Sequence, residues 1–346
     1  MSVRAMRGAA RLHGLLLVVL ALALAAALAV GWNDYHRFSV TALNVSPQQQ
    51  SIDVSRGTSF RGIVAELRRQ GLTTASPWYW RLLAEQMHVA GKLHAGEYAL
   101  APGITPRQLL SDMAAGKVLQ RNFTIVDGWT FAELRRALAQ ADVLQHDTSG
   151  LDDATIMQRI GAGGEAPEGR FLPETYAYVK GDGELDILRR AHAAMERTLA
   201  ALWPGRAPDL PLANPYQALI LASIVEKETG RADERAKIAG VFVRRLEHHM
   251  LLQTDPSVIY GMGARYDGNI RKSDLAADTP YNTYTRPGLP PTPIALPGRP
   301  AIAAALHPAA GDALYFVARG DGSHVFSSTL AEHNRNVDCY QRKRCR

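Results

Sequence analysis

Residues 214–230, NPYQALILASIVEKETG, are the stretch that decides the fold of the larger part of this chain. Asn214 can cap the start of a helix, and Pro215 suits the first helical position because its missing N–H has no partner to lose there. The apolar residues that follow recur three and four apart, which is typical of a helix packed against a core. The stretch therefore predicts a helix over 215–229, and Gly230 can end it.

Two glutamates lie near the end of this helix, Glu226 and Glu228. Because they are two residues apart, their side chains point in different directions on a helix. The positions three, four, seven and eight residues before Glu228 are all large aliphatics, whereas those before Glu226 are smaller and more mixed. A carboxyl group that continues an apolar stripe is desolvated, and desolvation favours its neutral form. A general acid for glycoside cleavage needs that form near neutral pH. An ion pair with an arginine at the helix end is the alternative for Glu228.

The loops after this helix are rich in Tyr, Asn, Thr, Gln and Pro and poor in Lys, Glu and Arg. Stiff loops that present neutral hydrogen-bonding groups and aromatic faces suit a sugar-binding groove, and ordinary surface loops are the alternative. The acidic candidate in these loops is Asp255, which is otherwise a turn residue before Pro256. We expect the following residues to contact the substrate or to orient Glu228: Gln253, Asp255, Tyr260, Asn282 and Tyr284.

The amino-terminus indicates the compartment. Arg4, Arg7 and Arg11 precede the uncharged run 14–32, whose 19 residues are close to the roughly 20 that cross a bilayer as a helix. The positive flank predicts that residues 1–13 stay in the cytoplasm. We therefore expect a single membrane span, with everything after about residue 33 exported from the cytoplasm. A cleaved signal peptide is the alternative.

The rest of the chain predicts an α+β protein with two folded parts. We expect a juxtamembrane linker over 33–50, a small α/β domain over 51–120, a larger mixed α+β domain over 121–336 and a basic tail over 337–346. The tail holds the chain's two cysteines, Cys339 and Cys345, whose spacing favours a disulfide or two inert thiols over a metal site.

Charge and composition narrow the partners. The formal net charge of +6 suits nucleic acid, anionic lipid or the acidic cell-wall polymer, but export of the folded parts argues against nucleic acid. Eleven histidines invite a metal hypothesis, yet the sequence has no HExxH motif and His248 and His249 are adjacent. The sequence therefore favours surface histidines over a metal site.

Several long motifs make the sequence resemble the MltG (YceG-like) endolytic murein transglycosylase family. They are LASIVEKETG at 221–230, LQTDPSVIYGMG at 252–263, YNTYTRPGLPPTPIALPG at 281–298, HVFSSTLAEHN at 324–334 and EGRFLPETY at 168–176. The likeness covers nearly all of residues 45–336. The segments 57–72 and 95–110 are similar to the LysM-like module of that family, so the resemblance implies a small LysM-like domain.

This resemblance implies that Glu228 is the catalytic residue and performs two tasks. As an acid it protonates the glycosidic oxygen between N-acetylmuramic acid and N-acetylglucosamine, and as a base it takes the proton of the muramyl 6-hydroxyl. The products then carry 1,6-anhydro ends, and no water enters them. The resemblance implies no metal and no cofactor. The resemblance also implies a single-pass protein of the bacterial inner membrane with its catalytic domain in the periplasm. It implies action on nascent glycan strands, in strand termination, beside peptidoglycan synthases.

Two other functions stay open at this point. A muramidase would hydrolyse the same bond and would need a second carboxylate, for which Asp255 is the candidate. A non-catalytic cell-wall anchor would use the LysM-like part alone.

Overall fold

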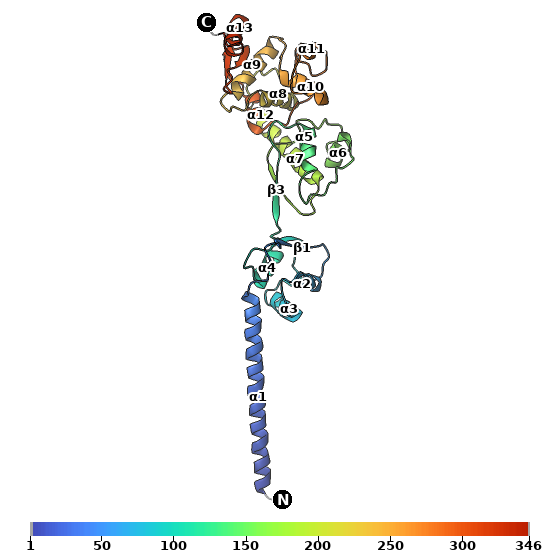
Figure 1. The fold of residues 1–346 in the computed structure, drawn as a ribbon, viewed down its shortest axis with the longest axis vertical. Helices are drawn as coiled ribbons and strands as arrows, with labels where there is room; N and C mark the ends of the chain where they lie inside the picture. The colour runs from blue at the N-terminus through green and yellow to red at the C-terminus, as the bar shows by residue number, and fades with distance from the viewer. Residues whose placement is uncertain (1–2, 345–346) are drawn as a thin grey trace. The chain divides into compact units, whose positions relative to one another are not determined.

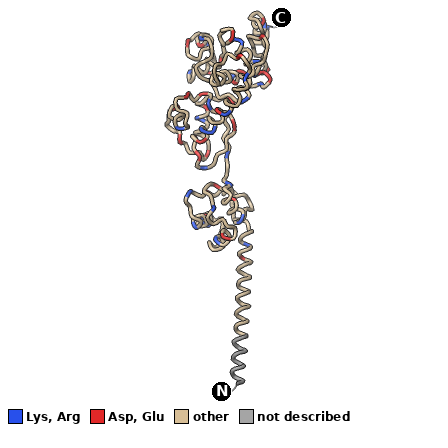
Figure 2. The backbone as a smooth tube through the Cα atoms, turned by 180° about the vertical axis from the view of Figure 1, so that it is seen from behind, with Lys and Arg blue, Asp and Glu red and all other residues tan. Residues whose placement is uncertain are grey.

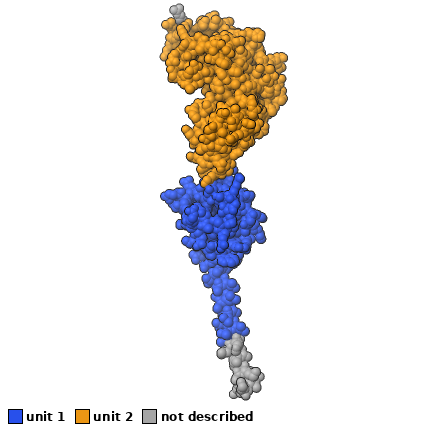
Figure 3. All heavy atoms as spheres, turned by 90° about the vertical axis from the view of Figure 1, so that its right-hand side faces the viewer, with its two compact units in different colours: residues 1–120 blue, residues 121–346 orange. Residues whose placement is uncertain are grey.

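The computed structural model describes residues 3–344, and the surroundings of side chains from residue 15 onward. The chain divides into two compact units, residues 1–120 and 121–346 (Figure 3). Helices predominate in the described residues, and the strands pair into three small two-stranded sheets, β1–β2, β3–β4 and β5–β6. The expected mixture of helices with small sheets is confirmed.

The first unit begins with a long helix, α1 (Val3–Val40), drawn in blue in Figure 1. Within it, Leu15–Val40 is long and apolar enough to cross a membrane, and none of its most apolar window is buried in the protein. The structure differs from the linker expected over 33–50, because the helix continues to Val40. Tyr35 and Leu43 are buried in the core of the unit, so this segment belongs to the fold. The side chains of residues 1–13 lie outside the described residues.

The remainder of the first unit is a small α/β fold. Its elements are β1 (Ser51–Val54), α2 (Phe60–Arg69), α3 (Pro77–Gln86), β2 (Gly96–Ala99) and α4 (Pro106–Ala114). The two strands pair antiparallel with Ile52 opposite Tyr98, and both side chains are buried. Polar side chains accept a backbone N–H at the start of all three helices, as sequence patterns of this kind predict.

The second unit starts with a subdomain around α7. Its elements are β3 (Gln120–Thr124), α5 (Phe131–Leu138), α6 (Asp153–Ile160), β4 (Thr175–Val179), α7 (Glu184–Leu202) and the short 3₁₀ helix η1 (Trp203–Gly205). One apolar cluster holds it together, and the stacked rings of Phe131 and Phe171 lie 5.1 Å apart within that cluster.

The second subdomain is built on α8 (Pro215–Glu228). Its other elements are α9 (Arg235–Glu247), α10 (Asp255–Met262), the 3₁₀ helix η2 (Gly263–Arg265), α11 (Lys272–Ala276), α12 (Arg299–Leu306), β5 (Tyr315–Ala318), β6 (His324–Ser327) and α13 (Leu330–Tyr340). Asn214 accepts the N–H of Gln217 and so caps α8, as expected. Every residue from 218 to 225 is buried, and small residues of α12 pack against the helix.

The carboxyl-terminal segment also differs from the expected basic tail. Helix α13 runs through the expected boundary at 336/337 and packs on β5 and β6, so residues up to Tyr340 belong to the second unit. Cys339 is disulfide-bonded. Cys345 lies outside the described residues.

Candidate active site

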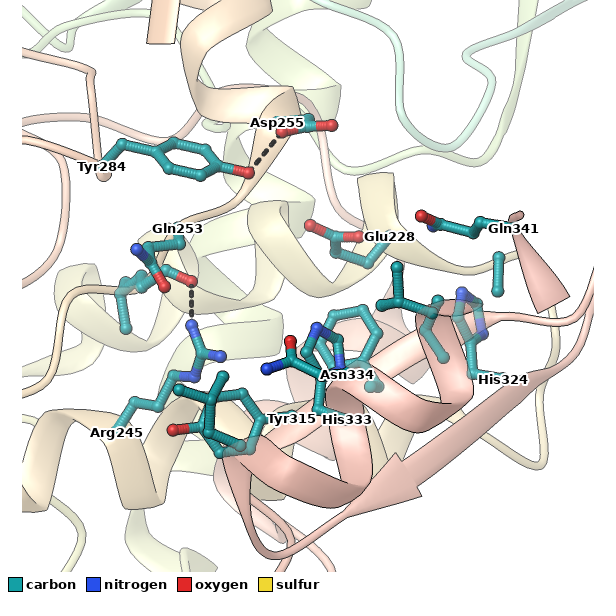
Figure 4. A pocket seen from close by; sticks show the side chains of 16 residues that line it. Glu228, Arg245, Gln253, Asp255, Tyr284, Tyr315, His324, His333, Asn334 and Gln341 are labelled. Atoms are coloured by element: carbon teal, nitrogen blue, oxygen red, sulfur yellow. Dashed lines mark hydrogen bonds between the residues drawn. The ribbon is translucent and has the colours of Figure 1, made fainter. Parts of the chain in front are cut away.

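A cavity of about 510 Å³ opens at the carboxyl end of α8, with α9, the loop before α10, β5, β6 and α13 around it (Figure 4). Four residues that the sequence singled out line this cavity together: Glu228, Gln253, Asp255 and Tyr284. They come from α8, from the turn into α10 and from the loop after α11. Folding therefore brings segments about 25 to 55 residues apart in the chain to one cavity.

Glu228 is the last residue of α8, and its carboxyl group points into the cavity (Figure 4). The hydroxyl of Thr254 donates a hydrogen bond to its Oε1, and among the described residues Glu228 forms no ion pair. Burial raises its pKa to about 7, with the nearby charge of Asp255 acting in the same direction. The bond from Thr254 and the positive charges of His324 and Arg245 oppose this shift. Near neutral pH, Glu228 can therefore hold a proton or release one.

Glu226 has different surroundings. It accepts the N–H of Gly298 at 3.0 Å, and its carboxylate lies 3.6 Å from the guanidinium of Arg235. Burial raises its pKa as well, so burial alone does not distinguish the two glutamates. The sequence predicted that α8 is buried on one side, along the apolar stripe before Glu228. The helix is instead buried on every side from residue 218 to 225, and this includes the small residues before Glu226. The two carboxylates differ in what they face: Glu226 faces the start of α12, and Glu228 faces the cavity.

Thr254 is a functional candidate that the sequence interpretation missed. It is 2% exposed, and its backbone N–H donates to Oγ1 of Thr283 at 3.0 Å. Ser257 donates to the carbonyl oxygen of Thr254 at 2.9 Å, so both backbone groups are held. Thr254 stands at the position before α10 but makes no side-chain cap, which leaves its hydroxyl for Glu228. A threonine directly before an Asp-Pro helix start is the signal that could have drawn attention to it.

Gln253, Asp255 and Tyr284 form the rim of the cavity beside Glu228. Gln253 is exposed and has a left-handed backbone with φ of 51°, which is uncommon for a residue other than glycine. Its N–H donates to the carbonyl oxygen of Thr283 at 3.0 Å, and this bond holds the turn. The Tyr284 hydroxyl donates to Oδ1 of Asp255 at 2.6 Å, a bond that Figure 4 shows as a dashed line. Burial and the Asp255 carboxylate raise the pKa of the Tyr284 hydroxyl, so it stays a donor at neutral pH.

Asn282 and Tyr260 do not line this cavity. Asn282 is 1% exposed, and its amide donates to three carbonyl oxygens at the end of α11 while its Oδ1 accepts the N–H of Tyr284. It thereby fixes the loop that carries Tyr284. Tyr260 donates to Oε2 of Glu168 at 3.0 Å, and the rings of Tyr260 and Tyr281 pack edge to face.

Glu168 is a second carboxyl group whose pKa is raised by burial. Burial raises its pKa to about 7, although the N–H of Phe131 and the hydroxyl of Tyr260 both donate to it. These donors come from α5 and α10, so Glu168 links the two subdomains of the second unit. It does not line the cavity that holds Glu228.

The opposite wall of the cavity is fixed by buried charged groups. Arg245 is 7% exposed and donates to the carbonyl oxygens of Leu251, Leu252 and Leu314, which ties α9 to the turn before α10 and to β5. His324 is held by Glu234, which accepts from its backbone N–H at 3.0 Å and lies 2.7 Å from its Nδ1. Although burial opposes it, the hydrogen bonds from His324 keep the pKa of Glu234 low.

One cluster in the described residues has side chains of metal-binding types. Glu165, His192 and Glu196 bring their ligand atoms within 4.8 Å of one another. The guanidinium of Arg170 lies 3.2 Å from Glu165 and 3.1 Å from Glu196, so the two carboxylates already have a cation between them. The cluster is therefore an ion-pair network between α7 and residues 165–170.

A family model, curated relatives and a solved structure all relate this chain to YceG-like proteins or endolytic murein transglycosylases. A model of the YceG-like family matches residues 52–339, which extends past the boundary expected at 336 and includes Cys339. The endolytic murein transglycosylase of Bacillus subtilis (strain 168) is 29% identical over 313 residues, 84% of each chain. That of Streptococcus pneumoniae serotype 2 is 32% identical over 176 residues, 49% of this chain and 31% of the relative. The crystal structure of a yceG-like protein from Listeria monocytogenes is 28% identical with a TM-score of 0.53, covering 83% of this chain and 98% of that one.

Proposed function

This chain belongs to the YceG-like family and is a peptidoglycan lytic transglycosylase, and from that premise we propose that Glu228 is its catalytic acid and base. We further propose that it cuts glycan strands internally, between N-acetylmuramic acid and N-acetylglucosamine, and leaves 1,6-anhydromuramyl ends. The observation that carries this proposal is that the carboxyl group of Glu228 faces the cavity. This carboxyl group has a pKa of about 7 and no ion-pair partner among the described residues.

The proposed reaction needs one carboxyl group in two protonation states. Protonated Glu228 gives its proton to the glycosidic oxygen, and the bond from muramyl C1 to that oxygen breaks with its electron pair going to the leaving sugar. The carboxylate then takes the proton of the muramyl 6-hydroxyl as O6 bonds to C1 and closes the anhydro ring. Glu228 is protonated again at the end, so a pKa near 7 serves both steps.

The other groups at the cavity have supporting roles in this proposal. Thr254 orients the carboxyl group and stabilises its ionised form through the hydrogen bond to Oε1. Gln253 and Tyr284 contact the sugars from the rim, and Asp255 holds the hydroxyl of Tyr284. Asn282 acts through the loop that it fixes, and Tyr260 acts through its bond to Glu168.

A muramidase is the second candidate, because Asp255 also lines the cavity and could serve as the second carboxylate of a hydrolase. Against it, the hydroxyl of Tyr284 donates a hydrogen bond to Oδ1 of Asp255, so that oxygen is already engaged within the protein. A purely non-catalytic anchor does not agree with the family membership established above.

We propose that α1 anchors the chain in the inner membrane as a single span, with residues 1–13 in the cytoplasm and both units in the periplasm. The small unit, with its LysM-like character, is proposed to bind glycan. In that place the enzyme would reach nascent strands beside peptidoglycan synthases and terminate them. Protease treatment of spheroplasts tests the orientation: digestion of both units from outside supports it, and full protection contradicts it.

Mass spectrometry of digested peptidoglycan tests the chemistry. The full chain is compared with Glu228→Gln and with Glu226→Gln, a control at a glutamate two residues away that faces α12. We expect internal cuts with anhydromuramyl ends from the wild type and from Glu226→Gln, and none from Glu228→Gln. Reducing ends would support the muramidase, and full activity of Glu228→Gln would remove Glu228 from the mechanism.

A further inference from the structure

The end of α1 is built into the core of the first unit. Tyr35 is 4% exposed, its hydroxyl donates to Oε1 of Gln86, and its ring lies 6.0 Å from that of Tyr79. One turn later, the ring of Phe38 lies 5.3 Å from that of Trp80. Helix α3 is therefore fixed alongside the last turns of α1, as Figure 1 shows.

The position of α3 along α1 sets its depth relative to a bilayer. Trp32 ends the uncharged run and has the residue type that favours the membrane interface. At a rise of 1.5 Å per residue, Tyr35 lies about 4.5 Å and Phe38 about 9 Å beyond Trp32 along the helix. The headgroup layer of one leaflet is roughly 5–7 Å thick. The ring of Tyr35 therefore lies at the level of the headgroups, and that of Phe38 at about their outer edge, when α1 spans the membrane.

The outer face of α3 is unusually apolar for a surface helix. Trp78 is 73% exposed, more than any other aromatic side chain in the described part of the chain. Leu82 follows four residues later on the same face and is 45% exposed. Phe60, Val64 and Pro77 extend this face into a hollow between α2 and α3. Exposed apolar surface of this kind marks a place where a partner covers the protein.

Basic groups flank this apolar face. Arg61 and Arg81 line the same hollow; Arg81 pairs with Glu85, whereas Arg61 has no partner among the described residues. Residues 33–120 contain nine Lys and Arg against six Asp and Glu, so the unit carries a positive charge. Guanidinium groups beside exposed Trp and Leu match the chemistry of an anionic phospholipid surface.

We infer that α3 lies in the headgroup layer of the bilayer, with Trp78 and Leu82 at the boundary of the acyl chains. Arg61 and Arg81 contact the phosphates of anionic phospholipids. This inference rests on the proposed membrane span of α1. Its consequence is that the first unit has one fixed face toward the membrane instead of turning freely on its anchor.

The experiment uses the full chain in nanodiscs of phosphatidylethanolamine and phosphatidylglycerol, with an environment-sensitive fluorophore on one introduced cysteine. Leu82→Cys reports on α3, and Leu22→Cys reports on the middle of α1. Lys117→Cys is the control, because Lys117 is exposed on the same unit. Labelling without reductant keeps the disulfide of Cys339 closed, and the unsubstituted chain measures the background.

We expect the fluorescence emission of the Leu82→Cys label to be blue-shifted, and to be quenched by lipids spin-labelled at the headgroup but not by iodide. We expect iodide to quench the Lys117→Cys label fully. If iodide quenches both labels while the Leu22→Cys label is protected, the inference is overturned and the anchor stands. If the Leu22→Cys label is also open to iodide, the anchor fails and the inference with it. A Leu82→Cys label that responds to soluble glycan fragments and not to spin-labelled lipids would show a glycan-binding face instead.

A second variant tests the role of charge. The double substitution Arg61→Gln, Arg81→Gln in the Leu82→Cys background is expected to reduce the blue shift on discs that contain phosphatidylglycerol. On discs of phosphatidylcholine alone it should have no effect. An equal blue shift with and without the two arginines on anionic discs would overturn the phosphate contacts.

Discussion

Substitution of Thr254 by valine removes the side-chain hydrogen bond that the structure gives to the carboxyl group of Glu228. Valine keeps the volume of the buried side chain, which is 2% exposed, and removes the hydroxyl that donates to Oε1. This bond stabilises the ionised carboxylate, so its loss raises the pKa of Glu228 above about 7. A hydrogen bond to a charged group is worth about 1.5–3 kcal/mol, which corresponds to roughly one to two pKa units.

The assay is the pH dependence of kcat/KM on isolated glycan strands. Glu228 acts first as an acid, so the alkaline limb of the profile reports its pKa in the free enzyme. We expect this limb to move upward by roughly one to two pH units in Thr254→Val, with a lower maximum because the carboxyl group is held less firmly. The matched control is Thr198→Val, a threonine that is equally buried but bonds to Arg299 on α12.

A Thr254→Val variant that is folded, as judged by circular dichroism, and keeps the alkaline limb of the wild type would refute this reasoning. In that case Thr254 would not set the protonation of Glu228. An equal shift in Thr198→Val would also count against it, because the effect would then be a general consequence of removing a buried hydroxyl.

Three further substitutions test the cavity wall, the carboxyl group that links the two subdomains, and the cavity rim. Arg245→Lys loses the planar guanidinium group that donates to three carbonyl oxygens, so we expect the free energy of unfolding to fall by about 3 kcal/mol. An unchanged midpoint of denaturant unfolding would contradict this. Because burial raises the pKa of Glu168 to about 7, its neutral form stabilises the fold at low pH, and that stability is lost as the pH rises from about 4.5 through 7. Between pH 5 and 8, the free energy of unfolding measured by thermal unfolding should therefore fall by up to about 3 kcal/mol less in Glu168→Gln than in the wild type. Glu174→Gln changes an exposed glutamate and should leave the fall as it is in the wild type. Gln253→Gly relieves a left-handed backbone, so stability should change by less than about 1 kcal/mol while KM rises; an unchanged KM would exclude Gln253 from the sugar contacts.

The helix that ends at Glu228 could be predicted from the sequence because its signals are local. Asn214 and Pro215 mark its start, and the apolar spacing marks its length, so the structure places α8 within one residue of the expected range. The direction in which each glutamate points could not be derived in the same way. Small residues of α12, some 80 positions further along the chain, pack against α8, and the N–H of Gly298 just before them donates to Glu226. No local pattern reports such contacts.

The cavity was predictable in part. Gln253, Asp255 and Tyr284 line it, and the polar composition of their loops is the feature that singled them out in the sequence. Thr254 was missed because its function depends on a contact with a residue 26 positions earlier. The continuation of α1 past Trp32 was missed because a polar juxtamembrane sequence also fits a linker. Only tertiary packing around Tyr35 shows that it is part of a core.

Digestion of peptidoglycan in water enriched in heavy oxygen tests the central claim most directly. A lytic transglycosylase closes the muramyl ring with its own 6-hydroxyl, whereas a hydrolase adds the oxygen of water. We predict that the new muramyl ends made by the wild type carry no heavy oxygen, and that Glu228→Gln makes no new ends. Heavy oxygen in the new ends, or new ends made by Glu228→Gln, would contradict the account.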